Sequence, residues 1–386
     1  MPFYTVGVPP TKAALLRPVA HEPEGDAGAT LPHAPVAPQA LLSQCCRTMD
    51  SAPFTRYLIV FTVTLVLWIS VVWAYTAWFP MAYRESGYVS WAAKKAMLDG
   101  CELGQIAFFG DSRLEAGFDP ADFTAPSTNF ALAAGTAIEA RVAIDRALAC
   151  PTLPRQAVIS LAPEHFGPVS SFYWLLSIRY GFLSAGDVLA VQRLAAQLGD
   201  TETLATRTPE GLSGAPRDWL YAAGFPSLSF SSLVRGRIFG RYSENQARLA
   251  TAKADRGWAA YVGGDPLRAE HPGRFIVTAL QNAEFEAALS ALRDRGVAAA
   301  ILIMPYAQTH EETGPVLAAY RDYLADMAKR TGATLLDPEI PIWPAPLFAD
   351  GAHLKPSSAH AFTAELAACL ADGRLAAPCE PAAPGE

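Results

Sequence analysis

The chain has 386 residues, and its 30 Lys and Arg against 37 Asp and Glu give a net charge of -7. This balance excludes the basic footprint with which a nucleic-acid-binding protein neutralises phosphates, so no nucleic-acid partner is expected. Hydrophobic residues make up 51% of the chain and charged residues 17%. A wholly disordered chain is also excluded, because there is ample apolar surface to bury.

Residues 1–56 are predicted to form a flexible tail rich in Pro and Ala. No sustained helical or strand period occurs in 1–48, and the prolines that recur there remove backbone donors and fix φ. Met49 lies near the end of this tail. The sequence therefore leaves open whether translation starts at Met1 or at Met49.

Residues 57–79 are predicted to form a transmembrane anchor, since no charged residue occurs between Arg56 and Arg84. A helix of this length spans about 34 Å, slightly more than the ~30 Å hydrocarbon core of a bilayer. Trp73 and Trp78 lie near one end, as in an interfacial aromatic belt. The alternatives are a buried core helix and a cleaved signal peptide. Basic residues flank the span on both sides and do not decide its orientation.

Residues 80–386 are predicted to form one α/β domain. Short apolar runs that end at turn residues indicate parallel buried strands at 105–109, 157–161, 298–304 and 333–336. Helical periodicity predicts helices over Thr136–Ala149, Leu280–Arg295 and Pro315–Arg330. This alternation favours a doubly wound parallel sheet with helices on both faces and ligands at the carboxyl ends of the strands. Residues 166–272 interrupt it and are interpreted as a mostly helical insertion that covers the site.

Two motifs far apart in sequence carry candidate chemistry. Ser112 follows the first predicted strand, where a sharp turn would present its hydroxyl at the sheet edge and aim backbone N–H groups at a developing oxyanion. Asp350 and His353 precede the last helix, for which Pro356 suits the first turn. Their spacing lets the carboxylate accept the imidazole Nδ1–H and leaves Nε2 free to act as a base on a serine hydroxyl.

Gly-Asp-Ser at 110–112 and the Asp350/His353 pair resemble the first and last blocks of the SGNH, or GDSL-type, hydrolase superfamily. Residues 129–136 resemble its second block, whose glycine supplies an oxyanion-hole N–H. The resemblance implies an SGNH-like fold, a Ser-His-Asp triad, an oxyanion hole built from the backbone N–H groups of Ser112 and Gly135, and no cofactor. Residues 160–165 stand where the third block normally has an asparagine donor. No asparagine occurs there, which leaves the third donor open, with His165 as one candidate.

Other residues near the predicted strand ends are candidates for lining the substrate site, and each also has a structural interpretation. These candidates are Arg113, Asn129, Glu164, His165, Tyr306 and His310. No cluster of His and Cys has the spacing of a metal site, so no metal is expected.

A membrane anchor followed by Phe-Gly-Asp-Ser-Arg and Gly-Phe-Asp-Pro resembles the anchored SGNH-like proteins of exopolysaccharide O-acylation, which accompany alginate and cellulose systems. This implies an O-acyltransferase or esterase acting on a polysaccharide, with a multi-spanning membrane acyltransferase and a polysaccharide synthase as partners. The alternative is a non-catalytic polysaccharide-binding or scaffold subunit, which the missing asparagine favours.

Four cysteines follow the anchor. Cys101 and Cys150 each precede a predicted strand; parallel neighbours lie ~4.8 Å apart, which would bring the two Cα atoms within disulfide range. Cys369 and Cys379 could close a small loop, and four free thiols are the alternative. Paired cysteines suit an oxidising periplasm. We therefore expect a single-pass protein of the bacterial inner membrane with its catalytic domain in the periplasm.

Overall fold

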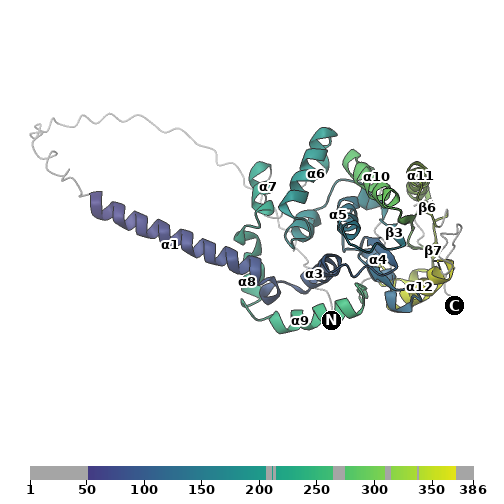
Figure 1. Ribbon diagram of the computed structural model, residues 1–386, viewed down its shortest axis with the longest axis horizontal. Helices are drawn as coiled ribbons and strands as arrows, with labels where there is room; N and C mark the ends of the chain where they lie inside the picture. Colours follow the sequence, from purple (N-terminus) through teal and green to yellow (C-terminus); the bar gives the residue numbers. More distant parts are fainter. Residues whose placement is uncertain are drawn as a thin grey trace, which may run out of the picture. The chain divides into compact units, whose positions relative to one another are not determined.

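The computed structural model describes residues 51–205, 211, 214–263, 274–308, 314–336 and 339–370 (Figure 1). The described residues from Val72 onward form one compact unit, and residues 51–71 belong to a second. The predicted tail lies outside the described residues except for its last positions, which are helical.

Helix α1 runs from Ser51 to Trp78, so the predicted span at 57–79 is helical and begins six residues early. Its segment Pro53–Trp78 has a mean hydropathy of 2.3, and no residue of its most apolar window is buried. Within the described ranges, this is the one helix long and apolar enough to cross a membrane. Helix α2 (Pro80–Tyr83) and helix α3 (Ser86–Asp99) follow at once.

A five-stranded parallel sheet lies within the unit that follows residue 71, and helices surround it (Figure 1). Its strand order is β2-β1-β3-β4-β6, which confirms a parallel α/β sheet. The four predicted strands are β1 (Ile106–Gly110), β3 (Gln156–Ser160), β4 (Ala298–Ile301) and β6 (Thr334–Leu335). Strand β2 (Ser127–Asn129) was not predicted, because its three polar residues form no apolar run even though all are buried.

Helices cover both faces of the sheet, because successive side chains of a strand point to opposite faces. Phe109 packs in one core cluster, together with residues of α3, α5, α10 and α11. Phe108 packs in a second cluster, together with residues of α4 and α12. The bounds of these helices are α4 Ser112–Gly117, α5 Ala137–Leu148, α10 Ala279–Asp294, α11 Gly314–Thr331 and α12 Pro356–Leu370. The helices predicted over 136–149, 280–295 and 315–330 are confirmed within one residue or so at each end.

The predicted insertion at 166–272 is mostly helical in its described part. It holds the π-helix η4 (Tyr173–Ile178), α6 (Ala185–Gln197), η5 (Thr201–Leu204), α7 (Ala215–Ala222), η6 (Pro226–Ser229), α8 (Phe230–Arg235) and α9 (Tyr242–Ala254). Trp174 and Tyr221 are buried in a third core cluster, and their rings meet edge to face. These two aromatic side chains therefore belong to the core of the insertion.

Short elements lead from the sheet into the last helix. The short helices η2 (Pro120–Asp122) and η3 (Pro163–Phe166) lie in the connections that follow β1 and β3. Near the C-terminal end, the strands β5 (Tyr306–Ala307) and β7 (Ile342–Trp343) pair in parallel as a small second sheet. Helix η7 (Ala345–Leu347) follows β7. An antiparallel bridge between Phe348 and Leu354 then closes a loop over residues 349–353, directly before α12.

The predicted disulfide between Cys101 and Cys150 is confirmed, with 5.7 Å between the two Cα atoms. It forms because β1 and β3 are parallel neighbours whose starts lie side by side, with Ile106 opposite Gln156. The predicted pair of Cys369 and Cys379 lies outside what the structure describes, since residues 371–386 and the Cys369 side chain are not covered.

We predict that Cys101→Ala/Cys150→Ala lowers the free energy of unfolding by about 2–4 kcal/mol, because the bridge closes a long loop in the unfolded chain. The two cysteines are 49 residues apart. Urea unfolding with and without reductant measures the loss, and reductant should leave the double variant unchanged. Equal stability of the two proteins would contradict the prediction.

A buried carboxyl at the interface of α10 and α5 makes the stability of the domain depend on pH. Burial raises the pKa of Glu284 to about 7, with Arg141 opposing the shift and Asp145 and Glu139 adding to it. The folded chain therefore holds a proton that the unfolded chain releases near pH 4.5. Stability should fall as pH rises from about 4.5 to about 7 and stay reduced above that.

We predict that Glu284→Gln stabilises the domain by about 1–3 kcal/mol near pH 8 and has little effect near pH 4, because the amide needs no ionisation. Urea unfolding at the two pH values tests this. Glu286→Gln on the same helix, at an exposed ion pair with Arg330, is the matched control. If Glu284→Gln raised the free energy of unfolding near pH 4 but not near pH 8, the predicted direction of the pH dependence would be wrong.

Candidate functional site

The turn that presents Ser112 is fixed by close backbone packing and by the Asp111 carboxylate. A Cβ atom at Gly110 would lie 2.0 Å from the carbonyl oxygen of Ser160, so only glycine fits at the end of β1. Asp111 is fully buried and caps α4, accepting the Arg113 N–H at 2.9 Å and the Ala162 N–H at 2.6 Å. Asp111 therefore orders this turn. Ser112, the first residue of α4, remains partly exposed.

The three residues that the sequence assigned to one triad lie in a continuous hydrogen-bonded chain. The His353 Nε2 is 2.8 Å from the Ser112 Oγ, and its Nδ1 is 2.9 Å from the Asp350 Oδ2. The loop closed by the bridge before α12 sets this geometry, since the Asp350 Oδ1 accepts the backbone N–H groups of Ala352 and His353. An imidazole held this way has one nitrogen on a carboxylate and the other on a hydroxyl, which suits proton transfer from the serine.

The electrostatics of the loop keep Asp350 ionised. Burial alone would raise its pKa, but the hydrogen bond and charge of His353 and the two backbone N–H groups outweigh burial and lower the pKa to about 2. Asp350 therefore carries its negative charge throughout the neutral range and can hold the Nδ1–H of His353.

Arg113 does not line a substrate site, contrary to the expectation. Its side chain is buried; Nη2 donates to the Pro305 carbonyl at 2.6 Å and Nε to the Ala352 carbonyl at 3.2 Å. Its guanidinium also lies 3.8 Å above the centre of the Tyr306 ring. Arg113 thus ties the turn that presents Ser112 to the loop that carries Asp350 and His353.

The other proposed lining residues divide into buried and exposed ones. Asn129 is fully buried and binds backbone groups, donating to the carbonyls of Leu114 and Phe118, so it is structural rather than substrate-lining. Tyr306 is also buried, beneath Arg113. Glu164 is exposed on η3, and the His165 Nε2 lies 3.5 Å from the Asp111 carboxylate. His310 lies outside the described residues.

The predicted oxyanion donors are only partly available. Among the described residues, no acceptor is found for the Ser112 N–H. The Gly135 N–H donates to the Leu132 carbonyl at 2.8 Å, so the expected role of Gly135 lacks a free donor in this structure. In the same turn the N–H groups of Ala133 and Ala134 find no acceptor within the described chain, and both residues are partly exposed.

The turn over residues 132–135 lies directly beside the turn that presents Ser112, because the Leu132 N–H donates to the Gly110 carbonyl. Ala134 adopts φ of 57°, the left-handed region that non-glycine residues seldom enter and that recurs at functional sites. Sequence reasoning chose the glycine of the segment as the donor. The conformational signal that distinguishes Ala134 appears only in the folded backbone.

A buried ion pair supports both turns from beneath. Lys94 of α3 bonds the Glu115 carboxylate on α4 and the Ala131 carbonyl, and Ser90 donates to the same carboxylate at 2.7 Å. Both charged side chains are buried. Removal of one partner from such a pair typically costs about 3–5 kcal/mol, because the other charge stays buried and uncompensated.

One aromatic residue of the insertion reaches the triad. The ring of Tyr261 stacks on the imidazole of His353, with centroids 4.2 Å apart and planes inclined by 9°. Sequence reasoning missed this residue, because an aromatic side chain after α9 carries no motif. It nevertheless fits the expectation that the insertion covers the site. The stack restricts the imidazole to the plane in which it meets both Ser112 and Asp350.

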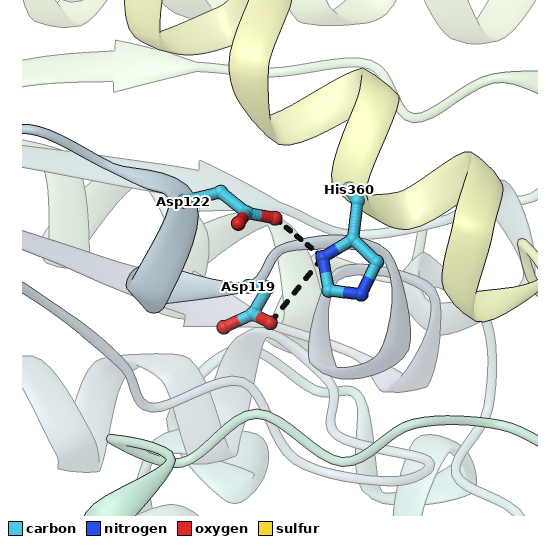
Figure 2. Close-up of side chains that lie close together, drawn as sticks. All are labelled: Asp119, Asp122 and His360. Atoms are coloured by element: carbon cyan, nitrogen blue, oxygen red, sulfur yellow. Dashed lines mark hydrogen bonds and ion pairs between the residues drawn. The ribbon is translucent and has the colours of Figure 1, made fainter.

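A second carboxylate-imidazole cluster lies where α12 meets η2. Figure 2 shows His360 directed from α12 toward Asp119 and Asp122; its Nδ1 contacts the Asp122 carboxylate and lies 3.5 Å from the Asp119 Oδ2. In the described part of the chain, these three residues are the one group whose ligand atoms are close enough to hold a metal ion. Without a metal ion, the contacts of this cluster already join α12 to η2. The hydrogen bond from the Asp119 N–H to the Thr363 hydroxyl adds to this connection.

No family model, no curated protein and no solved structure matches this chain.

We predict that Tyr261→Ala lowers any turnover of p-nitrophenyl acetate by about 3- to 10-fold, the size expected for losing an aromatic stack that orients the His353 ring. Tyr261→Phe keeps the stack and should retain turnover within about twofold. Steady-state kinetics of the two variants tests this. If the Phe variant lost as much as the Ala variant, the phenol hydroxyl and not the ring stack would be the important feature.

Proposed function

We propose that this chain is a membrane-anchored, serine-dependent acyl-ester enzyme of the SGNH type that acts on an exopolysaccharide. The observation that carries the proposal is the unbroken contact from the Ser112 Oγ through His353 to Asp350, at 2.8 Å and 2.9 Å. These residues come from opposite ends of the domain sequence and meet at the carboxyl end of β1, where doubly wound sheets bind ligands.

The geometry supports a two-step acyl transfer. The Ser112 Oγ attacks the ester carbonyl while its proton passes to the His353 Nε2, and Asp350 stabilises the imidazolium through Nδ1–H. The tetrahedral intermediate collapses as His353 returns the proton to the leaving alcohol, which leaves the acyl group on Ser112. A sugar hydroxyl or water then loses its proton to His353 and attacks the acyl-enzyme, and Ser112 is regenerated by the reverse proton transfer.

The oxyanion would be stabilised by backbone donors. The Ser112 N–H is free among the described residues, and the N–H groups of Ala133 and Ala134 lie in the adjoining turn. Each good donor contributes about 3 kcal/mol to the transition state, so the missing asparagine predicts a slower enzyme than one with three donors. That absence, together with the engaged Gly135 N–H, also supports the second candidate, a non-catalytic polysaccharide-binding or scaffold subunit.

The proposed location follows from two observations. The apolar helix α1 has the length of a membrane anchor, and the Cys101–Cys150 disulfide suits an oxidising compartment. We place the enzyme in the bacterial inner membrane with its α/β domain in the periplasm. There a multi-spanning acyltransferase would deliver acyl groups, and a polysaccharide synthase would deliver the polymer.

We predict that Ser112→Ala and His353→Ala each lower p-nitrophenyl acetate turnover by at least about 10³-fold, because each removes an essential member of one proton-transfer unit. The double variant should be little worse than either single variant. Ser243→Ala, at an exposed serine of α9, is the matched control and should keep full turnover. Losses that multiply independently, in variants with unchanged melting temperature, would contradict a shared triad.

A further inference from the structure

Large apolar side chains are exposed on the insertion around α8. Trp219 of α7, Phe230 and Val234 of α8, and Ile238 and Phe239 of the following turn are 54–67% exposed. Phe230 and Val234 are four residues apart and share one face of their helix. We call these five residues the apolar apron. So many large apolar side chains on one short segment are unusual for a surface that faces water and indicate an interaction site.

The apron is continuous with the C-terminal turns of α1. The Tyr75 ring meets Phe239 at 5.3 Å between centroids, and the Tyr75 hydroxyl donates to the Ile238 carbonyl at 2.8 Å. The Trp73 ring meets Phe225 at 5.6 Å, and Phe225 in turn meets Trp219. The aromatic end of the apolar helix and the apron therefore form one surface.

The backbone behind the apron is fixed to the residues that follow α1. A Cβ atom at Gly236 would lie 2.5 Å from the Tyr83 carbonyl oxygen, so the turn after α8 packs directly on α2. The Arg241 N–H donates to the Ala82 carbonyl at 3.2 Å, and the Asn245 side chain donates to the Arg84 carbonyl at 2.9 Å. The apron cannot swing away from the end of α1 without breaking these contacts.

The charges on this segment suit phospholipid headgroups. Arg235, Arg237 and Arg241 alternate with the apolar residues, and no Asp or Glu occurs from Phe225 to Tyr242. Arg235 and Arg237 are exposed. Aromatic and aliphatic side chains interleaved with arginines are typical of segments that lie in the bilayer interface, with the guanidinium groups reaching the headgroups.

We propose that the apolar apron inserts into the leaflet at the Trp78 end of α1, so that the α/β domain lies on the bilayer instead of moving freely on a tether. The inference rests on the proposed anchor, because it is the membrane crossed by α1 that supplies the lipid. It adds a second membrane contact made by the domain itself, with anionic phospholipid as the occupant.

Photo-crosslinking of the full chain tests this proposal. The chain carries p-benzoylphenylalanine in place of Phe230 or Phe239 and is reconstituted in vesicles of phosphatidylethanolamine and phosphatidylglycerol. Ile342, which is 50% exposed on β7, provides the matched position away from the apron. Leu65, within α1, is the control for the anchor. Irradiation followed by mass spectrometry measures the phospholipid adducts.

We expect about tenfold more lipid adduct at 230 and 239 than at 342, as for residues at the bilayer interface. Lipid adduct at position 65, combined with adduct at positions 230 and 239 that is no higher than at position 342, would overturn the inference. The proposed membrane anchor would be unaffected by that result. Cross-links between two copies of the chain at 230 and 239, in place of lipid adducts, would also overturn it. No lipid adduct at 65 would overturn the anchor and this inference together, whereas the triad would be unaffected.

Discussion

The candidate site depends on one buried carboxylate. Asp111 accepts the N–H of Arg113 in the first turn of α4 and the N–H of Ala162, which follows β3. It therefore joins the carboxyl ends of two neighbouring strands and fixes the turn from which Ser112 projects. Both bonds are made to backbone groups inside a fully buried environment, where an unpaired charge would be costly. Without this link the serine would have no defined position relative to the histidine.

The rest of the domain brings distant segments to that turn. Arg113 connects the Ser112 turn to the loop of Asp350 and His353 by donating a hydrogen bond to the Ala352 carbonyl. Lys94 connects α4 to the turn that follows β2, because its ammonium group bonds both the Glu115 carboxylate and the Ala131 carbonyl. The first segments after the apolar helix are thus part of the support of the site. The domain that holds Ser112, Asp350 and His353 and the segment that follows α1 are for this reason one structural unit.

Strong local signals made much of this predictable from the sequence. The apolar runs of β1, β3 and β4 specified the sheet, and the spacing of Asp350 and His353 specified their mutual contact. The disulfide followed from the adjacency of β1 and β3. Other features depend on tertiary packing: β2 has no apolar run, Tyr261 has no motif, and the left-handed backbone of Ala134 cannot be read from an alanine. Arg113 and Asn129 have the residue types and positions of site residues in the sequence. In the structure, however, their side-chain N–H groups donate hydrogen bonds to buried backbone carbonyls.

The proposed function requires Ser112 to be a nucleophile that His353 activates. Incubation of the full chain with a fluorophosphonate probe, followed by peptide mass spectrometry, tests this most directly, because the probe bonds only to a serine whose hydroxyl is activated. We expect a single stoichiometric adduct on the peptide that contains Ser112, and none in Ser112→Ala or His353→Ala. A folded protein that carries no adduct, or carries it on another serine, would mean that His353 does not activate Ser112 and would favour the non-catalytic polysaccharide-binding subunit.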